Sequence, residues 1–426
     1  MEEFKTYILE ELTIGKGSYG IAAPAIPFNP SKHTYLRITD INDDGTLNKQ
    51  GLMSVDDENA SNYILKENDI VFARTGNSTG RSYFYDGADG KLVYAGFLIK
   101  FSIDKKKVNP RILKYYTHSK PYFNWVRSFD TGGTRGNINA KTYGTMPITL
   151  PSRELQDKIV SILKSLDDKI ELNRRINGNL EQQAQALFKA WFVDFEPFKD
   201  GKFVDSELGR IPEGWKVGRF NNIIESTLSG DWGKERQEGN YIKKVFCLRG
   251  ADIPDVKIGN KGYMPIRFIL EKNFATKALT AGNLVIEISG GSPTQSTGRI
   301  CRISHELLTK YNNSIVCTNF CKAIRPMVGY SSFMYYMWEK LYNEGVMFSY
   351  ENGTTGIKNL DINGLTQKEP IIIPPIEVAL NFEKYVDIYY NKIQKNGIES
   401  EQLSHLRDTL LPRLMSGELN VNTITE

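Results

Sequence analysis

The stretch LQDKIVSILKSLDDKIELNRRINGNLEQQAQALFKAW, residues 155–191, gives the strongest indication of the architecture. Its apolar residues recur with a mean spacing of 3.5 residues, and two asparagines interrupt the series at its middle. Because this spacing places its members along one narrow side of a helix, the pattern predicts a coiled-coil seam. A helix of this length would extend about 55 Å, which is too long to lie on one small domain. The predicted seam residues are Ile159, Leu163, Leu166, Ile170, Asn173, Asn177, Leu180, Ala184, Leu187 and Trp191.

The same seam returns 223 residues later, with its polar interruption at the same place. The asparagines would fix the register of two paired helices, and we therefore expect two long antiparallel helices. The alternative is two ordinary amphipathic helices packed on separate domains, although such helices usually carry a wider apolar stripe. The predicted members of the second seam are Phe382, Val386, Tyr389, Ile393, Asn396, Ser400, Leu403, Leu410 and Leu414.

The far end of the second helix departs from the seam pattern. Arg407 occupies a seam position, which indicates that this end is less buried or contacts another chain. Pro412 should end the helix at Leu411 or kink it there, because proline cannot donate a helical hydrogen bond. Gly417 is the expected stop.

Outside the helices the chain repeats itself. The string YLRITDIN from Tyr35 returns as FCLRGADI from Phe246. ENDIVFARTGNSTGR, ending at Arg81, returns as AGNLVIEISGGSPTQSTGR, ending at Arg299. GGTRGNINAKTYGTMPITLPS likewise returns as NGTTGIKNLDINGLTQKEPIIIPP. The offset grows from 212 residues at Leu36 to 223 at Pro147, as expected when loops carry insertions.

Each copy predicts one α+β domain. Short β-branched and aromatic runs alternate with clusters of Gly, Asn and Asp, which is typical of a curled, mainly antiparallel sheet. One shorter helix is expected in each domain, near 110–125 and near 330–342. The expected organisation is a first strand-rich domain at 1–151, a helix at 152–198, a second strand-rich domain at 199–375 with an entry linker at 199–214, a second helix at 376–420, and a tail at 421–426.

Composition excludes several classes of protein. The 54 basic and 50 acidic residues give a net charge of +4. This charge is compatible with nucleic-acid binding but does not by itself indicate it. The sequence contains no run of 18 apolar residues, so it predicts no membrane span. The acidic start MEEFKTYILEEL is unlike a secretory signal. Four cysteines are too sparse for a disulfide framework, so we expect reduced thiols and a cytoplasmic protein. These cysteines are Cys247, Cys301, Cys317 and Cys321.

No catalytic or metal-binding constellation is evident. Cys317 and Cys321 should share one face of a strand as buried thiols, and a metal site is the weaker interpretation. The Gly-rich stretches 76–82 and 290–299 lack the spacing and the Lys of a P-loop, and no helix-forming segment follows them. They predict tight loops between strands. No close ligand pair exists among the four histidines, His33, His118, His305 and His405.

Four stretches together carry a resemblance to a known family. They are LDDKIELNRRINGNLEQQAQALFKAWFVDFEPF from Leu166, GRIPEGWKVGRF from Gly209, LRDTLLPRLMSGEL from Leu406, and the Gly-Thr-x-Gly strings at Gly133 and Gly353. Over essentially its full length the chain resembles the specificity subunits of bacterial or archaeal type I restriction-modification enzymes. The second helix departs slightly, because its entry IPPIEVALNF lacks the usual Glu-Gln pair.

This resemblance implies a division of labour. Each strand-rich domain would be a target recognition domain that reads one half of a split, asymmetric DNA sequence. The helices would act as a spacer and as the docking surface for two methyltransferase subunits, and through them for restriction subunits. S-adenosylmethionine, ATP and Mg would be held by those partners, so this chain would be non-catalytic, without a cofactor or a metal.

Candidate DNA-facing residues follow from the Gly-rich loops and nearby basic positions. Their Ser, Thr, Asn, Gln, Lys and Arg side chains can donate to phosphate oxygens and base edges. The alternative is that each is an ordinary solvated loop residue, since Arg and Asn are common in turns. The candidates are Arg74, Asn77, Ser78, Thr79, Arg81, Arg135, Asn137 and Lys141 in the first domain, and Lys234, Arg236, Ser292, Thr294, Gln295, Thr297, Arg299 and Lys358 in the second.

Two other functions remain open from the residues alone. One is a pure scaffold whose paired domains bind other proteins and whose helices set the spacing. The other is a nucleotide-dependent enzyme built on the Gly-Ser-Thr loops. The bases that would be recognised do not follow from the sequence, because shape readout contributes as well.

Overall fold

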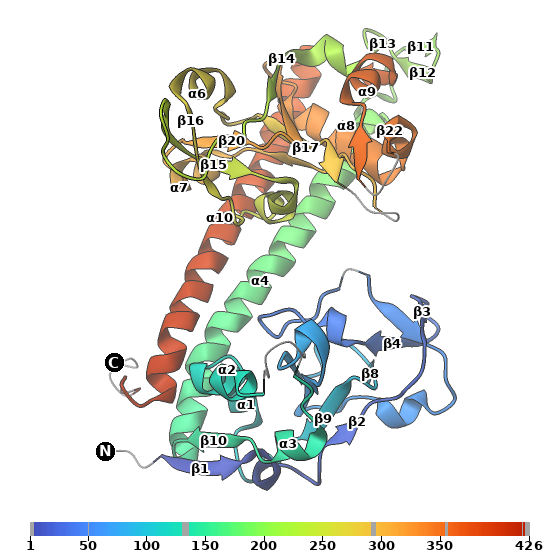
Figure 1. Ribbon diagram of the computed structural model, residues 1–426. Helices are drawn as coiled ribbons and strands as arrows, with labels where there is room; N and C mark the ends of the chain where they lie inside the picture. The colour runs from blue at the N-terminus through green and yellow to red at the C-terminus, as the bar shows by residue number, and fades with distance from the viewer. Residues whose placement is uncertain are drawn as a thin grey trace. The chain divides into compact units, whose positions relative to one another are not determined.

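The computed structural model describes residues 4–49, 51–129, 136–290, 295–353, 357–419 and 421 (Figure 1). The chain forms two compact units: unit 1 comprises residues 1–168 and 404–426, and unit 2 comprises residues 169–403. Helix α4 (Arg153–Phe192) begins in unit 1 and ends in unit 2, whereas α10 (Ile376–Met415) begins in unit 2 and ends in unit 1. The first domain predicted at 1–151 therefore also includes turns of both long helices.

The described residues of unit 1 form three small sheets. Only the β4–β8 pair is parallel among its named strands. The sheets are a ribbon of β1 (Lys5–Ile8) and β10 (Pro147–Leu150); a four-stranded sheet in the order β2 (Ser18–Tyr19), β9 (Leu98–Ser102), β6 (Asp69–Ala73) and β7 (Ser82–Tyr85); and another in the order β3 (Ala25–Pro27), β5 (Met53–Val55), β4 (His33–Leu36) and β8 (Leu92–Tyr94). The shorter helices are α1 (Pro110–Tyr116), α2 (Lys120–Arg127) and α3 (Ala140–Gly144).

Unit 2 repeats these sheets and adds to them. The sheets are β13 (Lys216–Gly218) with β24 (Ile371–Ile373); β14 (Ile224–Ser229), β21 (Cys321–Pro326), β17 (Leu284–Glu287) and β19 (Ile300–Arg302); β16 (Ile266–Leu270), β15 (Tyr241–Leu248) and β20 (Ile315–Cys317); β18 (Ser289–Gly290), β23 (Lys358–Leu360) and β22 (Glu351–Asn352); and the hairpin of β11 (Phe203–Ser206) and β12 (Gly209–Pro212). The shorter helices are α5 (Ile253–Lys257), α6 (Glu271–Lys277), α7 (His305–Lys310), α8 (Ser331–Asn343) and α9 (Ile362–Lys368).

The internal repeat holds at the level of strand register. Lys5 lies opposite Leu150 in the β1–β10 ribbon, and Lys216 lies opposite Ile373 in the β13–β24 ribbon. The offsets are 211 and 223 residues, so the two ladders pair equivalent residues. The parallel pair β4–β8 recurs as β15–β20, again in register. The predicted α+β domains, dominated by antiparallel pairs, are confirmed as two copies of one topology.

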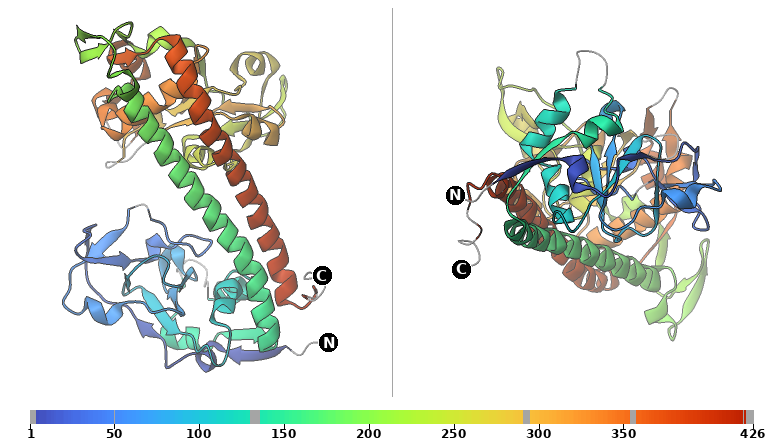
Figure 2. Two further views of the ribbon diagram at one scale, coloured as in Figure 1. Left: turned by 180° about the vertical axis from the view of Figure 1, so that it is seen from behind. Right: turned by 90° about the horizontal axis from the view of Figure 1, so that it is seen from below.

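The predicted helix pair is confirmed within unit 2. Asn396 Nδ2 donates to Asn177 Oδ1 at 2.8 Å, and Asn173 Nδ2 donates to Glu399 Oε2 at 2.8 Å. These bonds join α4 to α10 in antiparallel order, so the alternative of two separately packed helices is wrong. Every predicted seam residue is buried or half-buried. In each unit, segments of α4 (green) and α10 (red) lie side by side (Figure 2).

The helix ends differ from the expectations in detail. The helices were expected at 152–198 and 376–420, but they end at Phe192 and Met415. Pro412 does not end α10 at Leu411, because the helix continues through it. Gly417 follows with a left-handed φ of +74°, as expected of a stop.

Arg407 has its partner within unit 1. Its Nη1 lies 3.0 Å from Asp167 Oδ1 on α4, and its side chain is 23% exposed. An ion pair therefore takes the place of an apolar seam contact here, and a contact of Arg407 with another chain stays a prediction. Asp167 also accepts a bond of 2.8 Å from Lys114 Nζ on α1. The seam in unit 1 therefore ends on a charged cluster of Lys114, Asp167 and Arg407.

Two further expectations need correction. The helix expected at 110–125 is broken into α1 and α2, because Ser119 caps a new helix start by accepting from Tyr122 N. Cys317 and Cys321 do not share one strand, since a turn separates β20 from β21. Both thiols are nevertheless buried and unpaired, as are Cys247 and Cys301.

Each unit has a core that includes turns of the long helices. In unit 1, Leu411 and Leu414 of α10 pack with Ile159 and Leu163 of α4. In unit 2, the ring of Phe192 lies 4.9 Å from that of Phe382, between their centroids. The helices are thus part of the domains they connect.

Candidate nucleic-acid interface

The first Gly-rich loop is a preformed turn in unit 1. It contains a short 3₁₀ turn, η4 (Gly76–Ser78), and both Gly76 and Gly80 have positive φ angles, of +75° and +87°. Thr79 Oγ1 donates to the carbonyl oxygens of Gly76 at 2.8 Å and of Gly136 at 3.0 Å. Ser78 is buried, whereas Asn77 is exposed at the tip. Ser78 and Thr79 therefore shape the loop, and Asn77 faces the solvent.

Arg74 connects this loop with the segment 136–141. Its carbonyl oxygen accepts from Ile138 N at 3.0 Å. Its guanidinium lies 5.1 Å from the centre of the Tyr19 ring, and its buried Nε has no hydrogen-bond partner among the described residues. Asn137 and Lys141 of the neighbouring segment are exposed. The fold thus brings together candidates that lie about 60 residues apart in the sequence.

Arg81 is held by a surface contact. Its Nη2 lies 2.7 Å from Asp43 Oδ1, and its Nη1 donates to Ile41 O at 3.1 Å. The Asp43 side chain is 86% exposed, so this ion pair contributes little stability, on the order of 0–1 kcal/mol. A phosphate could replace it at low cost.

The second Gly-rich loop, in unit 2, is anchored on buried carboxylates. Arg299 makes two bonds to Glu287, of 2.8 and 2.7 Å, and the Glu287 side chain is only 5% exposed. Glu351 accepts from Thr297 N and Oγ1 at 2.6 and 2.9 Å and binds Lys358 Nζ at 3.0 Å. In this structure Thr297, Arg299 and Lys358 therefore stabilise the loop. Their contact with DNA stays a prediction.

The remaining candidates of unit 2 lie in exposed segments. Lys234 and Arg236 are exposed on the loop 230–240, where Lys234 Nζ lies 5.8 Å from the centre of the Tyr241 ring. Gln295 is also exposed. Arg135, Ser292 and Thr294 lie outside the described residues, as do Gly133 and Thr354 of the Gly-Thr strings.

One contact between the loop 230–240 and a neighbouring strand was not predicted from the sequence. The Arg267 guanidinium stacks 3.8 Å from the centre of the Trp232 ring, and its Nη1 lies 3.0 Å from Glu235. The buried Nε of Arg267 has no partner in the described part of the chain. The sequence signal for this contact was a tryptophan among the basic residues of 230–240. Its partner Arg267 lies in the strand β16, about 35 residues later, so only the folded structure shows the contact.

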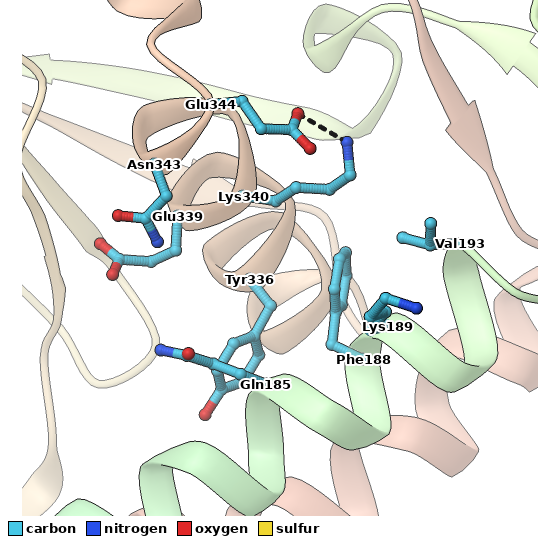
Figure 3. Close-up of a pocket in the computed structure, with 9 residues that line it drawn as sticks. All are labelled: Gln185, Phe188, Lys189, Val193, Tyr336, Glu339, Lys340, Asn343 and Glu344. Carbon is cyan, nitrogen blue, oxygen red and sulfur yellow. Dashed lines mark hydrogen bonds and ion pairs between the residues drawn. The ribbon is translucent and has the colours of Figure 1, made fainter.

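The two units also carry equivalent pockets. In unit 2, Gln185, Phe188 and Lys189 of α4 line a pocket against α8, which contributes Tyr336 and Lys340 (Figure 3). In unit 1, Asp408, Leu411 and Pro412 of α10 line a pocket against α1 and α2. The three α4 residues and the three α10 residues are related by the same offset of 223 positions. The repeat therefore extends to the place where a long helix passes the short helices.

The described residues show little that could perform catalysis. No group of three or more His, Cys, Asp or Glu in those ranges could hold a metal ion. Burial raises the pKa of Cys247, of Cys317 and of Cys321 to about 12, so these thiols are poor nucleophiles and poor metal ligands. No helix within the described ranges is long and apolar enough to cross a membrane.

Comparison with known proteins gives consistent results. Residues 3–182 match the family described as the type I restriction modification DNA specificity domain. The MjaIX specificity subunit of Methanocaldococcus jannaschii is 29% identical over 331 residues, covering 76% of this chain and 72% of its own. The HindI specificity subunit of Haemophilus influenzae is 25% identical over 413 residues, covering 83% and 87%.

A solved structure shares the fold. The type I restriction-modification S subunit from M. genitalium aligns with a TM-score of 0.55 and covers 97% of this chain and 96% of its own. At 14% identity the likeness concerns the fold alone. It agrees with two strand-rich domains linked by long helices.

Proposed function

Because this chain is related to the specificity subunits of type I restriction enzymes, we propose that it reads a bipartite, asymmetric DNA target. Each unit would read one half-site. The observation that carries this proposal is the repeat itself: equivalent strands pair in equivalent register, while the Gly-rich loops differ in sequence and anchoring. One scaffold with two different loops suits two different short sequences.

Affinity and selectivity would come from different side chains. Lys and Arg contacts to phosphate supply salt-dependent affinity, and a few loop side chains select bases. In unit 1 the exposed Asn77, Asn137 and Lys141 lie on adjoining segments and suit this role. In unit 2 the corresponding role would fall to Lys234, Arg236 and Gln295 and to the candidates outside the described residues.

The long helices would set the spacer between the half-sites. Successive turns of B-DNA recur at about 34 Å, so helices of 40 residues are of a comparable scale. The hydrogen bonds among Asn173, Asn177 and Asn396 favour one register of the helix pair. A fixed register would keep the number of unread base pairs constant.

We also propose that the helices dock two methyltransferase subunits and, through them, restriction subunits. Two observations support this: the equivalent pockets, and the apolar side chains that α4 and α10 expose. Leu172, Tyr385 and Ile388 are 50%, 50% and 66% exposed. In the proposed complex those partners hold S-adenosylmethionine, ATP and Mg, and this chain contributes no catalytic group. A cytoplasmic location follows from the proposed DNA target.

Co-expression with a type I modification subunit tests the proposal. The chain should co-purify with that subunit, and sequencing of the host DNA should reveal methylated adenine in a split motif. A chain carrying a scrambled α10 is the control and should yield neither. A pure protein scaffold would assemble without any methylated motif, and this result would overturn the proposal.

A further inference from the structure

Each unit displays one phenylalanine at the same place in the repeat. Phe97 lies in the turn between β8 and β9 and is 58% exposed. Phe320 lies in the turn between β20 and β21 and is 61% exposed. The two are 223 residues apart, which is also the offset between β8 and β20 and between β9 and β21.

The backbone that carries each ring is held in the same way. Phe97 O accepts from Arg74 N at 3.1 Å, and Phe320 O accepts from Ile288 N at 2.9 Å. Arg74 and Ile288 are each the first residue after an inner strand of the four-stranded sheet, β6 or β17, just before the Gly-rich loop. Through its backbone, each phenylalanine therefore adjoins the start of a loop predicted to meet DNA.

Neighbouring glycines hold the same turns. A Cβ at Gly20 would lie 2.3 Å from Ala95 O, and a Cβ at Gly230 would lie 1.9 Å from Thr318 O. Another chain segment therefore passes each turn at a distance that only glycine permits. The backbone under each ring is fixed on two sides, although the ring itself remains exposed.

The surroundings favour DNA over a protein partner. Single exposed apolar residues need no explanation, but one that recurs at the same place in both copies of the repeat is a specific arrangement. A cation occupies the adjoining position in unit 1, where Arg74 stands, whereas Ile288 occupies it in unit 2. In unit 1, Arg74 and the 41%-exposed Tyr19 adjoin the turn. Protein docking sites are usually contiguous apolar patches, whereas DNA-bending proteins insert single apolar side chains between base steps as wedges.

We propose that Phe97 and Phe320 are two equivalent wedges, each of which partly unstacks one base step in the half-site of its own domain. This inference rests on the proposed function. A wedge would make each half-site sensitive to the flexibility of one base step, beyond direct contacts to base edges. The prediction adds two aromatic residues to the donors of the Gly-rich loops.

The test uses the complex with the methyltransferase and duplexes that carry its methylated motif. 2-Aminopurine is placed at successive positions of each half-site, because its fluorescence rises when it is unstacked. With the unaltered chain the signal should rise at one step in each half-site. Phe97→Ala should abolish the rise in the first half-site only, and Phe320→Ala in the second only. Each variant should bind about tenfold more weakly.

Matched variants separate the wedge from general effects. Phe28→Ala and Tyr263→Ala remove rings that are 55% and 83% exposed elsewhere in units 1 and 2, and they should change nothing. Phe97→Trp should keep the fluorescence rise.

If the unaltered complex binds its motif without any rise, or if Phe97→Ala and Phe320→Ala keep the rise, the wedge proposal is overturned and the proposed function stands. If those variants lose the methyltransferase from the complex, the rings are protein contacts and the wedge is likewise overturned. Absence of sequence-specific binding by the unaltered complex would instead overturn the proposed function.

Discussion

The Gly-rich loops of the two units occupy the same place in the repeat but are held differently. Arg81 of unit 1 pairs with Asp43, whose side chain is 86% exposed, whereas Arg299 of unit 2 pairs with Glu287, which is 5% exposed. The strand ladders beneath them keep equivalent register. This scaffold therefore accommodates different loop side chains and anchors on an unchanged sheet, which suits a protein with two different targets.

The seam of the helices shows a second contrast. In unit 2 its polar interruption is a set of amide hydrogen bonds around Asn177 and Asn396. In unit 1 the polar residue of the seam is the charged Arg407, and Asp167 forms ion pairs with Arg407 and with Lys114. The position equivalent to Arg407 in unit 2 is Ala184, which is fully buried.

Exchange of the first loop should have the largest effect. Replacing residues 77–81 with an unrelated turn sequence should change the first half of the methylated motif completely and leave the second half unchanged, because each loop is anchored within its own unit. Sequencing of methylated DNA from the co-expressed complex measures this. As a control, one extra helical turn in α4 should alter the spacer while both half-sites persist. A loop exchange that altered both halves would contradict modular reading.

Loss of a buried carboxylate should have the next largest effect. Glu287→Ala leaves Arg299 half-buried and unpaired, so the free energy of unfolding of unit 2 should fall by about 3–5 kcal/mol. The equivalent change in unit 1, Asp43→Ala, should cost at most about 1 kcal/mol because that pair is exposed. Urea unfolding of the full chain compares the two. Equal losses would show that the two loops are anchored alike after all.

Removal of a seam amide should have a smaller effect. Asn177→Ala leaves the buried Asn396 amide without its acceptor, which should cost about 1–3 kcal/mol of unfolding free energy. Asn179→Ala, on the exposed side of the same helix, is the control and should cost much less. Both are read from chemical unfolding curves. A neutral Asn177→Ala would mean that the amide network does not stabilise the pair.

The charged cluster of unit 1 should respond to acid, with the smallest effect. Burial opposes ionisation of Asp167, but its ion pairs with Lys114 and Arg407 outweigh burial and lower its pKa below the usual range. A carboxyl whose folded pKa is depressed stabilises the protein above its unfolded pKa, and this contribution is lost as the pH falls through the folded value. Asp167→Asn should therefore lower the free energy of unfolding at pH 7. Below about pH 4 the free energies of unfolding of the variant and the unaltered chain should become more similar. A constant difference from pH 7 to pH 3 would contradict this role.

The helices and the repeat could be predicted from the sequence because both depend on periodicity. A spacing of 3.5 residues identified the seam, and every one of its predicted members is at least half-buried. The recurrence of three strings predicted two copies of one domain, which the strand register confirms. Local pattern sufficed here because neighbouring residues determine helix faces and strand runs.

Partners distant in the sequence could not be predicted in this way. Arg407 meets Asp167 across 240 positions, and Thr297 meets Glu351 across 54. The turn between Cys317 and Cys321 was missed, since both flanking runs are apolar and look like one strand. The DNA-facing roles of the loop candidates remain predictions, and three of those candidates lie outside the described residues.

The last turns of α10 have a consequence for the order of folding. Leu411 and Leu414 are 5% and 1% exposed in the core of unit 1, together with residues near the start of the chain. A ribosome delivers them about 400 residues after the first strand of that unit. Unit 2 is one continuous segment and can fold as it emerges, whereas unit 1 closes its core only after residues 411–414 have been made. The domain that is made first is therefore finished last.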